Sequence, residues 1–347
     1  MDKINFFPTN LDVQNKKIIL RLDLNVPLKD KVIEDYTRID LCLPFIKRLI
    51  EKKAKIIIIS HLGRPKNNKD PNLSLIPVYK YLKKTLQTNV YFFMGEFDEQ
   101  VEDKFSHLKE GEVILIENIR YFKEETEDED NFSKKLGSLG DIYINDAFSC
   151  SHRRQASVHK ITKYVKISYA GPLFKKEIDS INLVIKNKKE PVTCIIGGSK
   201  ISTKINVITS LLEKINNLII VGAMANNFLV YKNFKVGKSL VENDTKEIIE
   251  KIYNKALENN CEIMIPADCM VGTSFEGEGK NKELDKIQDN EIILDIGSNT
   301  ISNIKKKIEQ SNTVLWNGPA GYFENENFAV GTRSIAKSIS KNTLERS

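Results

Sequence analysis

The chain has 347 residues, of which 41% are hydrophobic and 29% are charged; this composition excludes a disordered polypeptide and is typical of a soluble protein with about two domains. The formal net charge of +6 comes from 53 basic and 47 acidic residues spread along the sequence, without the basic stripe or arm that is typical of a nucleic-acid-binding protein. No apolar run approaches the roughly 18 residues that a membrane span needs, and residues 1–10 contain no hydrophobic signal core. Five cysteines without a C-x-x-C pair argue against a zinc site or a disulfide framework, so we expect a protein of the reducing cytoplasm.

Short apolar runs rich in β-branched residues alternate with longer helical patterns along the whole sequence. The run of four isoleucines at 56–59 has no polar alternation, which is typical of a parallel strand covered by helices on both faces. Five strands are predicted in the first half, at residues 17–24, 55–60, 90–94, 113–117 and 142–145. Four more are predicted in the second half, at residues 192–196, 218–221, 261–266 and 313–316.

Apolar residues at spacings of three and four predict helices between these strands. One helix is expected to have Thr37 as its cap and to be interrupted at Pro44. A second is expected to follow a cap at Ser202, and a third to cover residues 329–340. The alternation of strands and helices predicts an α/β fold with parallel sheets.

Nine or more strands exceed one ordinary sheet, so we expect two doubly wound, Rossmann-like domains. A segment rich in Lys and Glu near residues 170–188 is predicted to be a hinge helix between them. The expected organisation is therefore a first domain at residues 1–172, a connecting helix at 173–188 and a second domain at 189–347.

In open α/β sheets, ligands bind beyond the carboxyl ends of the strands. In the first half, these positions carry three arginines and two histidines: His61, Arg64, Arg120, His152 and Arg153. Arginine pairs bidentately with phosphate and carboxylate groups, so the cluster predicts a small ligand with several negative charges. A surface ion pair would explain any one of these arginines, but it is a poor explanation for the whole group.

The strand ends of the second half are rich in glycine instead. Gly197-Gly198-Ser199-Lys200 opens a helix, and Lys200 and Lys204 are one helical turn apart. Glycines let the backbone approach a phosphate, so these ends predict a nucleotide site, although an ordinary turn would explain each one alone. Gly237-Lys238-Ser239 is not a P-loop, because position 232, where that motif needs a glycine, is a lysine.

Six segments together resemble the phosphoglycerate kinase family, in the family's order and spacing, and the resemblance runs from about residue 15 to residue 340. The segments are Asp23-Leu24-Asn25-Val26-Pro27, Ser60-His61-Leu62-Gly63-Arg64-Pro65, Glu117-Asn118-Ile119-Arg120-Tyr121, Asn145-Asp146-Ala147-Phe148, Gly197-Gly198-Ser199-Lys200 and Leu315-Trp316-Asn317-Gly318-Pro319. The resemblance implies a monomeric glycolytic enzyme that uses no nucleic acid or membrane partner. It would transfer a phosphoryl group in line from 1,3-bisphosphoglycerate to ADP when its domains close, giving 3-phosphoglycerate and ATP.

The resemblance also implies residue roles. Arg38, Lys200 and Lys204 would be catalytic, with Arg38 facing the transferring phosphoryl group. The phosphoglycerate would be bound by Asp23, Leu24, Asn25, Arg38, His61, Leu62, Gly63, Arg64, Arg120, His152 and Arg153. The nucleotide would be bound by Gly198, Lys204, Asn317, Pro319 and Glu324, with Glu324 accepting from the ribose hydroxyls. Mg²⁺ would bridge the phosphates of ATP or ADP without a protein ligand of its own.

The sequence departs from the family pattern at its end. The family usually continues with a further strand and a G-G-G-D-[ST] loop at a helix start, whereas this chain ends at Ser347. The nucleotide site is therefore expected to be incomplete. Two hypotheses follow: an active kinase, or a non-catalytic remnant that binds phosphoglycerate.

Overall fold

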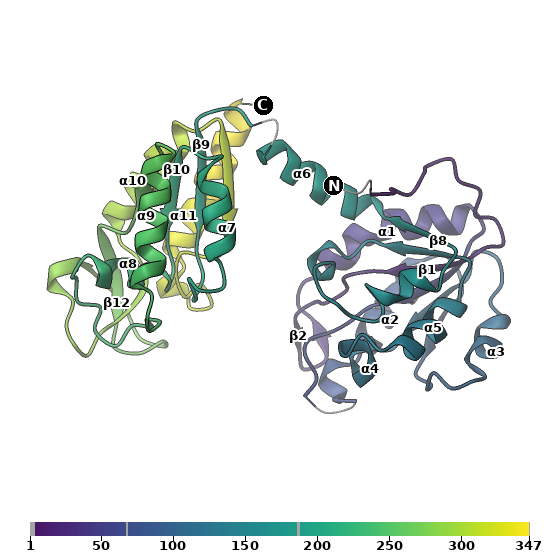
Figure 1. Ribbon diagram of the computed structural model, residues 1–347. Helices are drawn as coiled ribbons and strands as arrows, with labels where there is room; N and C mark the ends of the chain where they lie inside the picture. Colours follow the sequence, from purple (N-terminus) through teal and green to yellow (C-terminus); the bar gives the residue numbers. More distant parts are fainter. Residues whose placement is uncertain (1–3, 67–68, 186–187, 347) are drawn as a thin grey trace. The chain divides into compact units, whose positions relative to one another are not determined.

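The computed structural model describes residues 4–66, 69–185 and 188–346. The chain divides into two compact units, Met1–Ser180 and Ile181–Ser347 (Figure 1). The division falls within helix α6 (Pro172–Ile185), at the position of the predicted connector. Residues 186 and 187 of that predicted connector lie outside the described residues.

The first unit is built on a six-stranded sheet with the order β5-β6-β4-β1-β7-β8, in which every pairing is parallel. Its strands are β1 (Lys17–Arg21), β4 (Lys55–Ile59), β5 (Val90–Phe93), β6 (Val113–Ile116), β7 (Ile142–Asn145) and β8 (Ile167–Ala170). All five predicted strands are present, and β8 is an additional one. A short hairpin, β2 (Leu28–Lys29) and β3 (Val32–Ile33), and the single-turn helix α4 (Lys123–Thr126) complete the unit.

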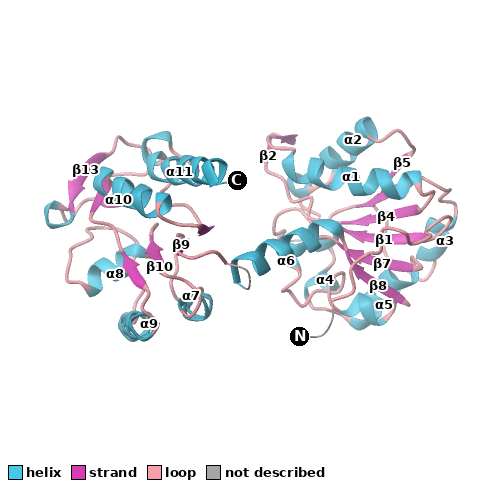
Figure 2. Cartoon of the chain, turned by 90° about the horizontal axis from the view of Figure 1, so that it is seen from above, coloured by secondary structure: helices cyan, strands magenta, loops and turns pink. Residues whose placement is uncertain are grey.

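Both faces of this sheet are covered, which explains the uninterrupted isoleucine run. Ile56 and Ile58 of β4 belong to one apolar core, and Ile57 and Ile59 belong to the other, because successive side chains of a strand point to opposite faces. The first core is closed by α1 (Thr37–Glu51) and α2 (Ile76–Thr85), and the second by α3 (Val101–Ser106) and α5 (Asp130–Ser138) (Figure 2).

Two predicted helix caps are wrong. Helix α1 begins at Thr37 itself, whose backbone N–H is accepted by Asp35 Oδ1 at 2.8 Å, and it continues through Pro44 as one helix. Helix α7 (Ile205–Leu212) begins three residues after Ser202, whose hydroxyl donates to Glu242 instead. A short polar side chain bonds to whichever partner the tertiary fold brings near, so local sequence does not settle its role.

The second unit contains two sheets. Four parallel strands have the order β11-β10-β9-β15 and match the four predicted ones: β9 (Val192–Ile196), β10 (Asn217–Ile220), β11 (Glu262–Met264) and β15 (Thr313–Asn317). An antiparallel sheet of order β13-β12-β14 was not predicted; its strands are β12 (Asp268–Gly272), β13 (Lys280–Glu283) and β14 (Ile292–Ile296). Strand β13 reads Lys-Asn-Lys-Glu and is mostly exposed, so it carries no apolar signal.

Helices again cover both faces of the parallel sheet. Cys194 and Ile196 of β9 pack with α7 and α9 (Lys246–Glu258), whereas Ile195 packs with α10 (Ser298–Glu309) and α11 (Val330–Arg346). Helix α8 (Ala225–Tyr231) follows β10. Helix α11 runs six residues beyond the predicted end. All five cysteines are unpaired and buried, and none of the described helices is both long and apolar enough to cross a membrane.

Candidate active site

Four neighbouring strands of the first unit, in the order β6-β4-β1-β7, end at one edge of the sheet, and a cavity of about 270 Å³ lies there. The cavity gathers segments that are far apart in the sequence. Its lining is formed by Asp23, Asn25, Arg38, His61, Gly63, Arg64, Arg120, Ser149, Cys150 and Arg153. Ser149 and Cys150 were not predicted, because neither residue type signals an anion site by itself.

Three predicted residues lie elsewhere. The side chains of Leu24 and Leu62 are buried in the apolar core on the α1 face of the sheet, where they anchor the loops that carry their neighbours. The side chain of His152 is exposed and does not line the cavity.

The loops at this edge are held in place by hydrogen bonds between them. Asp23 Oδ1 accepts from the Asn25 N–H at 3.1 Å, and Asn25 Oδ1 accepts from the Gly63 N–H at 2.8 Å. Gly63 has φ +58°, a backbone conformation that favours glycine, and a Cβ there would also push the Leu73 side chain aside, since it would lie 2.6 Å from Leu73 Cδ2. The buried amide of Asn118 donates to the carbonyl of Leu62 at 2.7 Å and so joins two of the loops.

The arginines of the cavity leave donors without partners. Arg120 Nη1 donates to the Gly63 carbonyl at 2.7 Å, but its Nη2 is buried and has no partner among the described residues, and the same is true of Arg153 Nε. Burial and the neighbouring charge of Arg153 lower the pKa of Arg120 to about 10. Arg38 pairs with Asp23, which is the one carboxylate lining the cavity. An anion would supply both the missing acceptors and the missing charge.

His61 is kept neutral by its surroundings. Burial and the nearby guanidinium of Arg21 lower the pKa of His61 to about 3, so the imidazole is uncharged at neutral pH. Arg21 Nη2 lies 3.2 Å from His61 Nδ1, and Arg21 is itself fully buried. The sequence analysis missed Arg21, because an arginine inside a predicted strand carries no sign that its side chain reaches a site.

Asp23 is held as a carboxylate. Burial alone would raise its pKa, but the hydroxyl of Ser149 and the guanidinium of Arg38 outweigh burial, and the net effect lowers the pKa. Asp23 therefore orients Arg38 at the rim of the cavity, where half of the Arg38 side chain is exposed.

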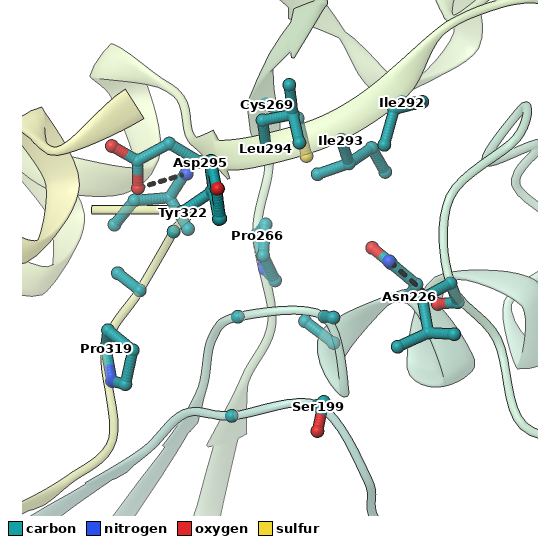
Figure 3. Close-up of a pocket in the computed structure, with 18 of the residues that line it drawn as sticks. Ser199, Asn226, Pro266, Cys269, Ile292, Ile293, Leu294, Asp295, Pro319 and Tyr322 are labelled. Atoms are coloured by element: carbon teal, nitrogen blue, oxygen red, sulfur yellow. Dashed lines mark hydrogen bonds between the residues drawn. The ribbon is translucent and has the colours of Figure 1, made fainter. Parts of the chain in front are cut away.

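A second cavity, of about 440 Å³, lies in the other unit at the carboxyl ends of β9, β10 and β15 (Figure 3). Three predicted residues line it: Gly198, Pro319 and Glu324. Much of the rest of its wall comes from α8, from the β12–β14 sheet and from residues 320–322, which the sequence analysis had not assigned to a site.

Glycines let the three strand ends approach one another closely. A Cβ at Gly197 would lie 2.1 Å from the Pro319 carbonyl oxygen, and one at Gly318 would lie 2.6 Å from the Gly197 carbonyl oxygen. Gly222 has φ +68°, and a Cβ there would lie 2.7 Å from the Gly198 nitrogen. Backbone therefore forms this rim of the cavity, where side chains would separate the strands.

The predicted lysines occupy different positions. Lys204 Nζ donates to the Gly197 carbonyl and to Asn317 Oδ1, both at 2.7 Å, and burial lowers the pKa of this amine. A Cβ at Gly198 would lie 3.4 Å from Lys204 Nζ, which places the amine beside the rim. Lys200 is exposed, and neither it nor Asn317 lines the cavity.

The far wall of the cavity is apolar. Ile292, Ile293 and Leu294 of β14 line it, together with Phe275 and Tyr322, whose rings meet edge to face with centroids 5.1 Å apart. Such a wall suits a flat heterocycle, because burial of its faces removes apolar surface from water. These residues come from the antiparallel sheet, from its β12–β13 loop and from the segment after β15, so no single local motif could have identified them. Within the described part of the chain, no group of three or more His, Cys, Asp or Glu side chains is arranged to hold a metal ion.

Comparisons with known proteins agree on one family. The family model for phosphoglycerate kinase matches residues 9–346. The phosphoglycerate kinase of Wolbachia pipientis wMel is 45% identical over 332 residues, which cover 95% of this chain and 83% of the relative. That of Dictyoglomus turgidum is 41% identical over 333 residues, which cover 95% and 84%.

Solved structures agree as well. The structure of phosphoglycerate kinase from Coxiella burnetii superimposes with a TM-score of 0.78 at 37% sequence identity. The superposition covers 96% of this chain and 84% of the Coxiella chain. The structure from Pyrococcus horikoshii OT3 superimposes with a TM-score of 0.83 at 27% identity, covering 97% and 86%. The match spans nearly the whole chain, in sequence and in fold alike, and it includes the strand ends that form both cavities. The chain therefore belongs to the phosphoglycerate kinase family.

Proposed function

We propose that the cavity of the first unit binds the phosphoglycerate and that the cavity of the second unit binds ADP or ATP. This assignment serves the reaction to which family membership points, the glycolytic transfer of a phosphoryl group between 1,3-bisphosphoglycerate and ADP. Residues 1–172 would then be the phosphoglycerate domain and residues 189–347 the nucleotide domain. Residues 173–188 would connect them.

The observation that carries the first half of the proposal is the excess of unpaired positive charge in the 270 Å³ cavity. Four arginines line it, Arg38, Arg64, Arg120 and Arg153, against the single carboxylate of Asp23. Two of these guanidinium groups hold buried nitrogens without partners among the described residues. A three-carbon acid that carries a carboxylate and a phosphate would supply acceptors to several of these donors at once.

The second half of the proposal rests on the contrast between the two sides of the 440 Å³ cavity. Its apolar wall suits a base, and its glycine rim with Lys204 suits phosphates. Glu324 is exposed at the same cavity and could accept from ribose hydroxyls. We further propose that Mg²⁺ arrives with the nucleotide, because this ion binds phosphate oxygens and keeps several waters.

In the proposed mechanism, a β-phosphate oxygen of ADP attacks the acyl phosphate phosphorus, and the carboxylate of 3-phosphoglycerate leaves. A carboxylate is a good leaving group, so no general acid is needed, and the neutral state of His61 is compatible with a binding role. The protein would contribute positioning and charge: Arg38 and Lys204 would stabilise the negative charge on the transferring group. Lys200, exposed and free to move, would contact the phosphates from solvent.

The experiment that tests the proposal is titration calorimetry with 3-phosphoglycerate and with Mg-ADP, combined with a coupled assay of transfer. An active kinase binds both ligands and turns over. A phosphoglycerate-binding remnant would bind the acid alone, and that result would overturn the nucleotide half of the proposal.

The variant Arg38→Ala tests the catalytic assignment. We expect transfer to fall at least 10²-fold, as is roughly typical when one preorganised charge partner of a transition state is lost, while the fold survives because the side chain is half exposed. Arg48→Ala is the matched control, since Arg48 lies on the same helix but donates to the Thr9 carbonyl, away from the cavity. Wild-type turnover in Arg38→Ala would remove Arg38 from the mechanism.

A further inference from the structure

One polar side chain in the nucleotide cavity is buried and only half satisfied. Asn226 is the second residue of α8, is 1% exposed and lines the 440 Å³ cavity. Its Nδ2 donates to the Leu240 carbonyl at 3.0 Å. Its Oδ1 has no hydrogen-bond partner in the described part of the chain. Figure 3 shows this amide facing the space between the cavity walls.

The orientation of the amide is determined by its neighbours. Exchanging the oxygen and nitrogen of Asn226 would set its Oδ1 against the Leu240 carbonyl, so that two acceptors would face each other. The loop that carries Leu240 is itself attached to the residue before β14, because the Lys238 N–H donates to the Glu291 carbonyl at 2.7 Å. Asn226 therefore presents a fixed acceptor to the cavity.

A buried acceptor without a partner is unfavourable, so a ligand that brings a donor to this position gains affinity. The carboxylate of Asp295 also lines the cavity, but its oxygens already accept from the Ile296 and Gly331 N–H groups, both within 2.8 Å, whereas Asn226 Oδ1 has no partner among the described residues. The apolar residues of β14 on the facing wall offer no acceptor side chains.

We propose that Asn226 Oδ1 accepts a hydrogen bond from the 6-amino group of adenine and so makes this site selective for adenine over 6-oxopurine nucleotides. This inference rests on the proposed nucleotide site. The 6-amino group is the only donor on the base of a bound adenine nucleotide. A 6-oxopurine places a carbonyl oxygen there, and that oxygen then faces the acceptor of a side chain that is only 1% exposed.

The test compares the binding of ADP and inosine diphosphate, each with Mg²⁺, to the wild-type chain and to Asn226→Leu by titration calorimetry. In the wild type, ADP should bind roughly tenfold more tightly, as expected for one buried polar group left unpaired. In Asn226→Leu, which has a similar side-chain volume but no acceptor, the two affinities should become equal.

The ratio of the two affinities separates this inference from a general loss of structure, because misfolded protein weakens both nucleotides alike. Equal binding of the two nucleotides by the wild type would overturn the inference and leave the proposed nucleotide site intact. An undiminished preference for ADP in Asn226→Leu would do the same. If neither nucleotide binds to the wild type, the nucleotide site itself is refuted, and the role of Asn226 with it.

Discussion

Replacement of Arg21 by methionine tests the buried network behind the 270 Å³ cavity of the first unit. The Arg21 guanidinium donates to Ser157 Oγ at 3.0 Å and to the Leu22 carbonyl at 2.6 Å, and it contacts His61. The N–H and hydroxyl of Ser157 both donate to the carboxylate of Glu125 at 2.7 Å. Arg21, Ser157 and Glu125 are all fully buried, so one positive and one negative charge balance inside the unit.

The loss of one charge from a buried pair typically costs about 3–5 kcal/mol, because the other charge stays buried without compensation. Methionine fills much of the space of arginine, so the added cavity is small and charge dominates the cost. Whole domains are stable by about 5–15 kcal/mol, and Arg21→Met should therefore lose a large share of the stability of the first unit.

The cost should also depend on pH. Burial raises the pKa of Glu125, and the nearby Arg21 opposes that rise. Without Arg21, the folded-state pKa rises further above the unfolded value. Such a group supports the folded state while it is protonated, and this support is lost as the pH rises through the folded-state pKa. Arg21→Met should thus be less destabilised at about pH 5 than at about pH 8.

The assay is urea unfolding of the wild type, Arg21→Met, Glu125→Gln and the double variant, followed by far-UV circular dichroism. Trp316, the only tryptophan of the chain, gives a separate fluorescence signal from β15 of the second unit. We expect the double variant to lose less than the sum of the single losses by about 0.5–3 kcal/mol, the range for residues of one network. Additive losses, or a loss in Arg21→Met that does not change with pH, would refute the reasoning.

Two further predictions concern the site residues. The ¹⁵N resonances of His61 should not titrate between about pH 5 and pH 8, because burial and Arg21 lower the pKa of His61 to about 3. The folded form then binds fewer protons than the unfolded chain, so His61 should reduce the stability of the folded state as the pH falls below about 6.5. A His61 resonance that titrates near pH 6.5 would contradict the burial argument. Gly197→Ala should destabilise the second unit by about 1–3 kcal/mol, because the added Cβ would lie 2.1 Å from a backbone oxygen. In the control Gly277→Ala, the added Cβ would lie 3.2 Å from the side-chain oxygen of Ser274, and the urea midpoint should change little. Equal effects of the two glycine variants would show that the close approach of the strand ends is not a constraint.

Most of the fold could be predicted from apolar periodicity. The isoleucine run of β4 indicated a strand buried on both faces, and its residues do divide between two cores. The antiparallel sheet could not be predicted, because β13 is polar and exposed and gains its strand conformation by pairing with β12. Helix caps failed for a related reason, since Ser202 finds its partner Glu242 through the tertiary fold.

The sequence by itself determined the order of the elements, the family and the arginines and glycines at the strand ends, because these depend on residue type and on position relative to each strand. Only the tertiary structure decided which of those residues share a cavity. It set Leu24 and Leu62 into the core, left His152 in solvent and brought the buried Arg21 against His61. Burial and charge pairing depend on contacts between distant segments, so the neutral state of His61 and the unpaired acceptor of Asn226 exist only in the folded chain.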